Sequence, residues 1–275
     1  MQKKPLVSIL IASFNKEKLV KRCINSCIKQ TYKKIEIIFV DNDSSDNSYK
    51  IAKQFKNIKV YKKKRVKYSN FKFNSFNQTD TYLYAFKKSK GNIICFLDSD
   101  DFFKKNKVYE IVNYFLKNPK NNIIFDKPII FFDKKKKYNS KEFNKNINRN
   151  FLWPKFPPQS CISIKRFFLN KIINEISKKK FELLALDFKI ATVSKYIYNE
   201  FNIIEKFLTY YFQDLKGESY SNYKKFNFNW WIRRLSAHKY LKYISTKYKK
   251  NHINGLDYYF TRIIVLLLST FKKNI

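Results

Sequence analysis

The chain has 275 residues, which is enough for one large domain or two small ones with a substantial buried core and excludes a short peptide scaffold. Lysine and arginine together number 58 against 21 aspartates and glutamates, so the formal net charge is +37. This excess fits a polyanionic partner, either nucleic acid or an anionic membrane surface, but it also fits codon drift in an AT-rich genome, because the basic runs are scattered beside expected turns.

The first half of the chain alternates short apolar runs with amphipathic stretches, which predicts strands and helices in turn. The strand runs carry continuous apolar residues instead of a strict alternation, so the sheet should be covered on both faces by helices. Strands are expected at residues 6–12, 35–40, 58–61 and 93–97, and helices at residues 16–30, 45–55, 82–89 and 107–117. The predicted fold class is α/β, with a mainly parallel sheet flanked by helices.

The second half of the chain is less regular. Two strand candidates at residues 123–125 and 129–132 precede a basic loop, a Trp-Pro segment at residues 153–158 and a helix near residues 165–176. The stretch from residue 226 onward is expected to be helical, aromatic and basic. We therefore divide the chain into residues 1–121, residues 122–225 and a helical C-terminal extension at residues 226–275.

The chain carries few signals for disulfides, structural metals or export. The cysteines (Cys23, Cys27, Cys95 and Cys161) form no CxxC pair, and neither His238 nor His252 has a companion at zinc-ligand spacing. The first apolar run lacks a leader-peptidase site, and the longest late run is far shorter than the roughly 20 residues that span a bilayer. We expect a soluble or membrane-surface protein in a reducing compartment.

Acidic residues follow two of the predicted strands. Asp41 and Asn42 come after one strand, and Asp98, Ser99 and Asp100 come after another. Ligands of such sheets bind at the carboxyl ends of the strands, so both groups should reach one rim. Carboxylates at positions i and i+2 suit Mg²⁺ or Mn²⁺ together with phosphate oxygens. The alternative is an acidic turn that caps the next helix.

Four motifs in order carry a resemblance to a known family. They read VSILIASFN at residues 7–15, CIKQTY at 27–32, IIFVDNDSSD at 37–46 and GNIICFLDSDD at 91–101. Together they resemble the signature of family 2 glycosyltransferases, over about residues 5–118 and more weakly to residue 221. The resemblance implies the GT-A fold and an inverting hexosyltransferase that uses a nucleoside-diphosphate sugar, above all a UDP-sugar. It also implies a hydroxyl acceptor on a growing bacterial surface glycan, namely a lipooligosaccharide, a capsule or a lipid-linked oligosaccharide.

The resemblance assigns the donor site residue by residue. The nucleotide-binding positions that it implies are Ala12, Ser13, Phe14, Asn15, Asp41, Asn42, Asp98 and Ser99. Asp100, together with Asp98, is implied to hold a divalent metal cofactor, Mn²⁺ or Mg²⁺. Ala12 replaces the usual proline, and Asn42 replaces the usual second acid beside the uracil, which removes a charge that reinforces the contact.

The acceptor side is assigned in the same way. Asp187, within residues 184–190, resembles the acid that acts as general base, although Leu186 precedes it where a glutamate is usual; a helix-capping aspartate is the alternative. Residues 160–166 resemble the segment under the sugar, and residues 216–221 resemble a loop over the diphosphate. Residues 1–121 then become the nucleotide-sugar-binding half and residues 122–225 the acceptor-binding half.

The C-terminal extension interleaves aromatic residues with lysine and arginine, which favours contact with an anionic bilayer surface; packing on the catalytic domain or on a second copy is the alternative. The expected location is therefore cytoplasmic, peripheral on the inner face of the bacterial inner membrane. A basic nucleic-acid-binding protein and a catalytically silent, membrane-associated GT-A-like assembly protein are the rival functions. Acids gathered at strand ends would repel a phosphate backbone, so no nucleic-acid partner is expected.

Overall fold

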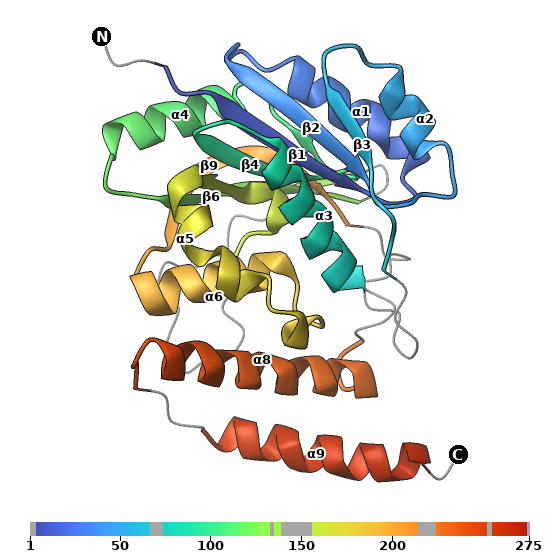
Figure 1. The fold of residues 1–275 in the computed structure, drawn as a ribbon, viewed down its shortest axis with the longest axis vertical. Coiled ribbons are helices and arrows are strands. Elements are labelled where there is room, and N and C mark those ends of the chain that lie inside the picture. The colour runs from blue at the N-terminus through green and yellow to red at the C-terminus, as the bar shows by residue number, and fades with distance from the viewer. Residues whose placement is uncertain are drawn as a thin grey trace.

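A computed structural model describes residues 4–66, 74–132, 135–138, 156–213, 224–251 and 255–273. Within these residues, one mixed sheet of nine strands forms the centre of the molecule (Figure 1). Its strands are β1 (Val7–Ser13), β2 (Ile35–Asp41), β3 (Lys59–Lys62), β4 (Ile93–Asp98), β5 (Phe102–Phe103), β6 (Ile123–Phe132), β7 (Lys135–Tyr138), β8 (Ile162–Lys165) and β9 (Asn202–Phe212). The spatial order is β3-β2-β1-β4-β8-β6-β9-β5, with β7 paired to β6.

The sheet has a parallel part and a mixed part. Strands β3, β2, β1 and β4 are parallel neighbours, as the apolar runs predict. β8 pairs antiparallel with both β4 and β6, while β9 runs parallel to β6 and antiparallel to β5. One continuous sheet therefore joins the first half of the chain to the second.

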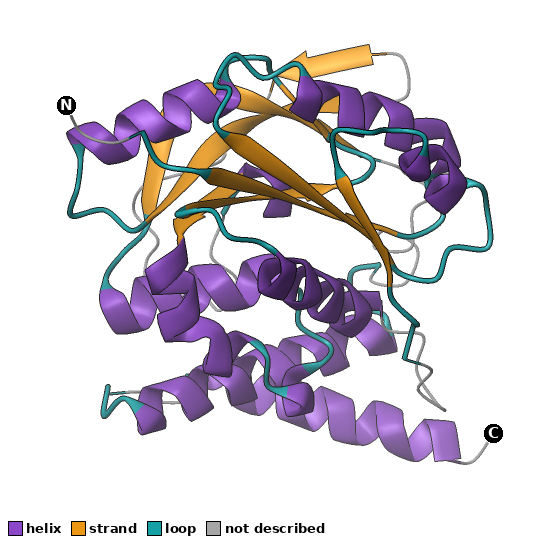
Figure 2. Ribbon diagram, turned by 45° about the horizontal axis from the view of Figure 1, so that its top comes forward, coloured by secondary structure: helices purple, strands orange, loops and turns teal. Residues whose placement is uncertain are grey.

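Helices cover both faces of the sheet (Figure 2). One face packs against α1 (Glu17–Ile28), α2 (Ser48–Lys53) and α4 (Lys107–Lys117), and the other against α3 (Asn74–Lys88), α5 (Arg166–Ile176) and α6 (Leu186–Tyr198). β1 shows why: Val7, Ile9 and Ile11 point to the first layer, whereas Leu10 and Ala12 point to the second. Both faces of the strand are apolar because both are buried.

Two long helices complete the fold at the far end from the parallel strands (Figure 1). α8 (Phe228–Lys247) packs under α6, where the Tyr240 ring lies 4.9 Å from the ring of Phe181 and 6.3 Å from that of Phe188. α9 (Leu256–Lys273) packs against α8. None of the helices in the described residues is both long and apolar enough to cross a membrane.

The structure revises several predicted boundaries. The strand candidates 123–125 and 129–132 form one strand, β6, whose register shifts around Lys127. The helix expected at residues 82–89 begins earlier, at Asn74. Its first turns were not predicted because they carry polar side chains, which form hydrogen bonds inside the molecule, instead of an apolar stripe. β9 was not predicted from the sequence; in the sheet it lies between β6 and β5.

Candidate active site

The residues predicted to bind the nucleotide lie together at the carboxyl ends of the parallel strands. Ser13 lies opposite Asp41 in the pairing of β1 with β2, and Ala12 lies opposite Asp98 in the pairing of β1 with β4. Beyond the strands, the Asn42 N–H donates to the Ser13 carbonyl at 2.8 Å, and the Ser99 N–H donates to the Ala12 carbonyl at 3.2 Å. The predicted rim is therefore a single surface.

A turn after β1 closes one side of this rim. Asn15 has a φ of 51°, in the left-handed region that asparagine tolerates better than most residues. Its N–H donates to Ser44 Oγ at 3.0 Å, and its Oδ1 accepts the Ser45 N–H at 2.9 Å, so the loop after β2 is fixed to the end of β1. Beside it, the Arg65 guanidinium lies 3.8 Å from the centre of the Phe14 ring. This pair forms a flat wall next to the strand ends.

Buried polar atoms at the rim have no hydrogen-bond partner within the described part of the chain. Asp41 is fully buried; its Oδ2 accepts the Ser44 N–H at 2.9 Å, but its Oδ1 has no such partner. The Ser13 hydroxyl is also buried without one. A buried polar atom without a partner costs free energy, which a bound ligand with complementary groups would recover. The two atoms therefore mark a place for a polar ligand.

Asp98 is held by side chains from α3 and from the turn before β8. Its Oδ1 accepts the amide N–H of Gln78 and the hydroxyl of Tyr82, each at 2.8 Å. Its backbone N–H donates to Ser160 Oγ at 2.9 Å. Burial, reinforced by the negative charge of Asp100, raises the pKa of Asp98 to about 7. The carboxylate is fixed in place and poorly solvated when no cation is near.

Asp100 and Asp101 have different environments although they are adjacent. Asp100 is partly exposed, and its Oδ2 lies 2.8 Å from Lys16 Nζ. Asp101 is fully buried, where it accepts hydrogen bonds from the Ser160 hydroxyl and, at 2.8 Å, from the Phe212 N–H. Burial and the nearby acids raise the pKa of Asp101. Asp100 is therefore available to a ligand, whereas Asp101 positions the turn.

Asp98 and Asp100 suit a divalent cation whose other ligands come from a phosphate. Among the described residues, no three His, Cys, Asp or Glu side chains are grouped as a protein-only metal site. Mg²⁺ and related ions commonly bind one or two carboxylates plus substrate phosphates, so two carboxylates are sufficient. Asp100 Oδ2 lies 2.8 Å from Lys16 Nζ and is partly exposed, so a positively charged group can reach this oxygen. The donor set therefore fits a metal bound with a diphosphate.

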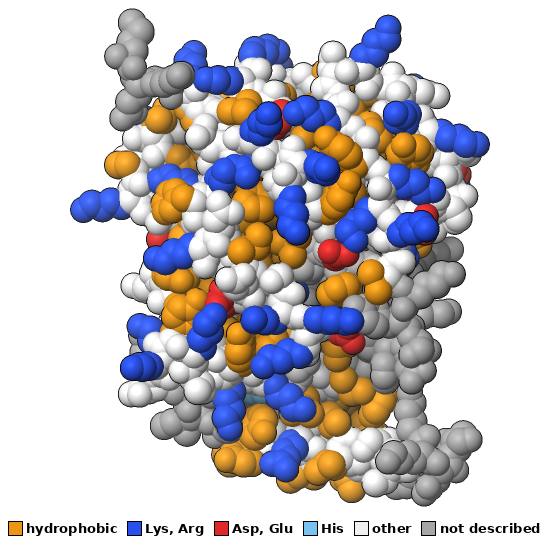
Figure 3. Space-filling model, viewed as in Figure 1, with side chains coloured by type: hydrophobic (Ala, Val, Ile, Leu, Met, Phe, Trp, Pro, Cys, Tyr) orange, Lys and Arg blue, Asp and Glu red, His pale blue; other side chains and the backbone are white. Residues whose placement is uncertain are grey.

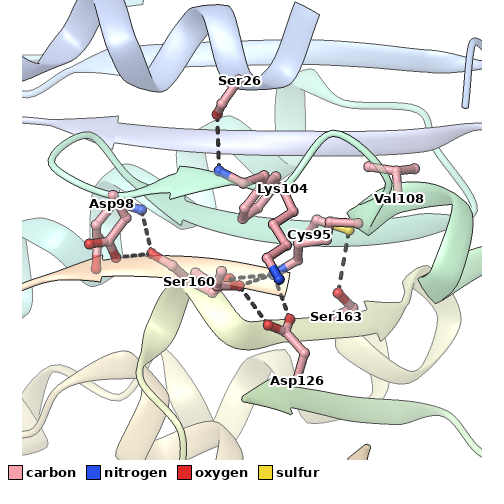
Figure 4. Close-up of polar contacts among 12 residues, drawn as sticks. Ser26, Cys95, Asp98, Lys104, Val108, Asp126, Ser160 and Ser163 are labelled. Carbon is pink, nitrogen blue, oxygen red and sulfur yellow. Dashed lines mark hydrogen bonds and ion pairs between the residues drawn. The ribbon is translucent and has the colours of Figure 1, made fainter. Parts of the chain in front are cut away.

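A buried ionic network supports the turn that carries these acids. Lys107 Nζ lies 2.6 Å from Asp126, and both side chains are fully buried. The same ammonium donates to the Ser160 carbonyl at 2.7 Å and to Thr209 Oγ1 at 2.6 Å. Ser160 lies between Asp98 and Asp126 in Figure 4, so it joins this network to the rim. Side chains of α4, β6 and β9 therefore hold the acidic turn at residues 98–101 in place.

Asp187, the predicted base, lies on the second residue of α6. Its Oδ1 accepts the Phe188 N–H at 2.7 Å, although the N-cap residue of the helix is Ala185. Burial raises the pKa of Asp187, against the positive charges of Arg233 and Lys189. Its negative charge is near enough to Asp98 to add to the raised pKa of that carboxyl. A residue of the second half of the chain therefore lies near Asp98.

Two positive residues beside Asp187 were not predicted. Lys189 is 1% exposed, its Nζ donates to Thr79 Oγ1 at 3.3 Å, and burial lowers its pKa to about 7. Arg233 belongs to α8 and precedes Tyr240 by two helical turns, on the face that packs toward Phe188. Lys189 could have been noticed as a lysine inside an apolar helical stretch. Arg233 could not be predicted without knowing that α8 packs under α6.

The remaining predicted features lie away from the strand ends or outside the described residues. His238 Nε2 lies 3.0 Å from Asp257 in a contact between α8 and α9. All four cysteines are buried and free. Residues 216–221, residues 153–155 and His252 lie outside the described residues.

Comparison with known proteins gives the site a family context. The family model described as "Glycosyl transferase family 2" matches residues 8–177. An Escherichia coli protein, the UDP-Glc:alpha-D-GlcNAc-diphosphoundecaprenol beta-1,3-glucosyltransferase WfgD, is 34% identical over 113 residues, which cover 41% of this chain and 42% of that protein. The first three curated relatives are all matched over less than half of their own length.

Solved structures share the fold. Staphylococcus aureus TarS 1–349 in complex with UDP-GlcNAc superposes with a TM-score of 0.60 at 18% identity, covering 86% of this chain and 66% of that chain. The mannosyltransferase PcManGT from Pyrobaculum calidifontis, in complex with GDP-Man and Mn²⁺, superposes with a TM-score of 0.53 at 12% identity, covering 92% of this chain and 67% of that chain. The described sheet and its flanking helices therefore have the arrangement of these transferases.

Proposed function

The chain belongs to glycosyl transferase family 2, and we propose that it is an inverting glycosyltransferase. It moves a hexosyl group from a UDP-sugar to a hydroxyl of a growing bacterial surface glycan. Residues 1–121 bind the donor, and residues 122–225 bind the acceptor. The observation that carries the proposal is the meeting of Ser13, Asp41 and Asp98 at the ends of three neighbouring strands, next to Asp187 from the second half.

The nucleotide is proposed to bind where buried polar atoms have no partner. The Asp41 carboxylate can accept an N–H of the base, and Asn42, held beside it by the Ser13 carbonyl, can offer its amide to the same edge. Phe14 and Arg65 provide a flat surface for the base or ribose. Ala12 and Asn15 complete the wall with backbone, and Asp98 and Ser99 face the ribose side.

The diphosphate is proposed to bind at Asp100, with Asp98, through Mn²⁺ or Mg²⁺. Such an ion offsets the negative charge that develops on the departing nucleoside diphosphate. Lys16, which pairs with Asp100 at 2.8 Å, adds a second positive charge within reach of the same phosphates. Tyr82 and Gln78 keep the Asp98 carboxylate in one orientation. Preorganised charge of this kind needs little rearrangement during the reaction.

Asp187 is proposed to be the general base. It removes the proton from the acceptor hydroxyl while that oxygen attacks the anomeric carbon from the face opposite the leaving diphosphate, so the configuration inverts. Its raised pKa makes it a better base than an exposed aspartate. Arg233 and Lys189 stabilise the ionised form that must be present before the reaction begins.

The acceptor is proposed to be carried at a membrane, with the enzyme peripheral on the inner face of the bacterial inner membrane. The E. coli relative is named for a sugar on diphosphoundecaprenol, and S. aureus TarS is named as a poly(ribitol-phosphate) beta-N-acetylglucosaminyltransferase. The net charge of +37 suits an anionic membrane surface. Nucleic acid is not proposed as a partner, because the acids of the rim would repel its backbone.

A screen of nucleotide sugars tests this function. Wild-type protein is incubated with each UDP-, GDP- and dTDP-sugar in Mn²⁺ or Mg²⁺, and the released nucleoside diphosphate is measured, with each sample repeated in EDTA. Metal-dependent release from one donor, strongest with UDP-sugars, is the expected result. If no donor is turned over while UDP still binds, the chain is the silent assembly protein instead. If no nucleotide or nucleotide sugar binds but duplex DNA does, the protein is a nucleic-acid-binding protein.

A further inference from the structure

α9 presents a continuous apolar surface to solvent. Its exposed side chains recur every three or four residues, the spacing that places them on one face of a helix. They are Leu256, Tyr259, Phe260, Ile263, Leu266 and Leu267, with exposed fractions of 90%, 51%, 59%, 56%, 57% and 55% respectively. We call these six residues the outer face of α9. Exposed apolar area of this kind marks an interaction surface.

The outer face is held in a fixed position by the opposite side of the helix. Thr261, between the exposed residues, is fully buried. At the start of α9, Asp257 lies 2.6 Å from the Arg234 guanidinium and 3.0 Å from His238 Nε2, both on α8. The Trp231 and Phe260 rings are 5.9 Å apart at the same junction. α9 is thus attached to the body through α8 and is the outermost helix at that end of the molecule (Figure 1).

The charge of the surface distinguishes a bilayer from a second copy of the chain. Arg262 is exposed at the flank of the outer face, about 100° around the helix from Ile263, and the one acid of α9, Asp257, is already engaged by α8. If two copies paired antiparallel through this face, the two Arg262 side chains would lie at the same edge of the interface, which is unfavourable. Anionic lipid headgroups would instead accept it. Figure 3 shows hydrophobic side chains along the lower edge of the molecule, with lysines and arginines spread above them.

We propose that the outer face of α9 binds an anionic lipid bilayer, with the helix lying in the plane of the interface. The six apolar side chains enter the boundary between headgroups and acyl chains, and Arg262 contacts the phosphates. This inference deepens the proposed function by naming the surface that meets the membrane, and it rests on that function for the membrane location alone. The helix does not need to span the bilayer.

Vesicle flotation with full-length variants tests the inference. The double substitution Ile263→Gln and Leu267→Gln removes two outer-face side chains, and Phe167→Gln is the matched control, because Phe167 is 59% exposed on α5. On phosphatidylcholine vesicles that contain phosphatidylglycerol, the double variant should bind on the order of tenfold or more weakly than wild type. Phe167→Gln should bind like wild type. Arg262→Gln should lose affinity for these vesicles but show little change on pure phosphatidylcholine.

Three further readouts make the result decisive. Equal melting temperatures show that the variants are folded. Light scattering reports the mass of each protein in solution. If the wild type is a dimer, the double variant is a monomer and neither binds vesicles, the inference is overturned in favour of self-association. Vesicle binding by the double variant equal to that of wild type would also overturn it. Release of nucleoside diphosphate with a water-soluble acceptor should be unchanged in the double variant. Loss of turnover in every sample with vesicle binding intact would reject the proposed function and leave the surface assigned.

Discussion

At the scale of single residues, the site is built from carboxylates whose surroundings differ although several are close in sequence. Asp101 is fully buried and accepts hydrogen bonds from Ser160 and Phe212, whereas Asp100 is partly exposed beside Lys16. The strand-end positions of the acids could be predicted from the sequence, because the end of each apolar run indicates where the strand ends. The division of roles among them could not, since their partners come from distant elements.

Asp187→Asn separates catalysis from binding. Asparagine keeps the size and much of the hydrogen bonding of aspartate but cannot take the acceptor proton, so kcat should fall by about 10² to 10⁴. The donor Kd should barely change, because the nucleotide is bound at the other strand ends. The melting temperature should not fall, because the N-cap residue of α6 is Ala185 and asparagine can still accept the Phe188 N–H. An unchanged kcat would move the base to another acid, such as Glu182.

Asp98→Asn should stabilise the metal-free protein in a pH-dependent way. Folding raises the pKa of Asp98 to about 7, so the folded state keeps a proton that the unfolded state has lost. The wild type therefore loses stability as the pH rises from about 4 to about 7, and the loss persists above that range. Asparagine can still accept from Gln78 and Tyr82 and carries no charge. In EDTA, its melting temperature relative to wild type should rise by roughly 2 °C or more between pH 5 and pH 8. A difference independent of pH would show that Asp98 is not desolvated in the folded protein.

At the scale of helices and strands, prediction succeeded where one local signal was sufficient. β1, β2 and β4 are mainly apolar, and α4 has the predicted bounds, from Lys107 to Lys117. The first half of α3 gave no such signal, because its polar side chains form hydrogen bonds inside the molecule, as Asn77 does with Val66 and Gln78 with Asp98. β9 lacks a regular alternation of buried and exposed residues, so the period that identifies a strand with one buried face is missing.

The junction of α4, β6 and β9 depends on the buried Lys107–Asp126 pair. Lys107→Met leaves Asp126 buried without its counter-charge and should destabilise the protein by about 3 to 5 kcal/mol. The double variant Lys107→Met with Asp126→Leu removes both charges and should recover much of that loss. Urea unfolding of wild type, both single variants and the double variant measures the coupling. Additive losses in the double variant would show that the two groups do not interact.

At the scale of the whole molecule, one surface gathers acids in a chain that is otherwise strongly basic. In the proposed mechanism the donor-binding strands, helix α6 with Asp187 and helix α8 with Arg233 act together, and α6 contacts both α3 and α8. The family resemblance in the sequence covered the strands and Asp187. It did not extend to Arg233, because no pattern in α8 indicates which helix it packs against.

The central claim is that Asp100 holds a metal-bound sugar nucleotide for transfer. The direct test measures UDP release from the preferred UDP-sugar by wild type in Mn²⁺, by wild type in EDTA, and by Asp100→Ala in Mn²⁺. Turnover in the first sample alone is predicted, together with weaker UDP binding in the other two, because the diphosphate loses its bridging cation. Wild-type rates in EDTA, or a fully active Asp100→Ala protein, would contradict the account.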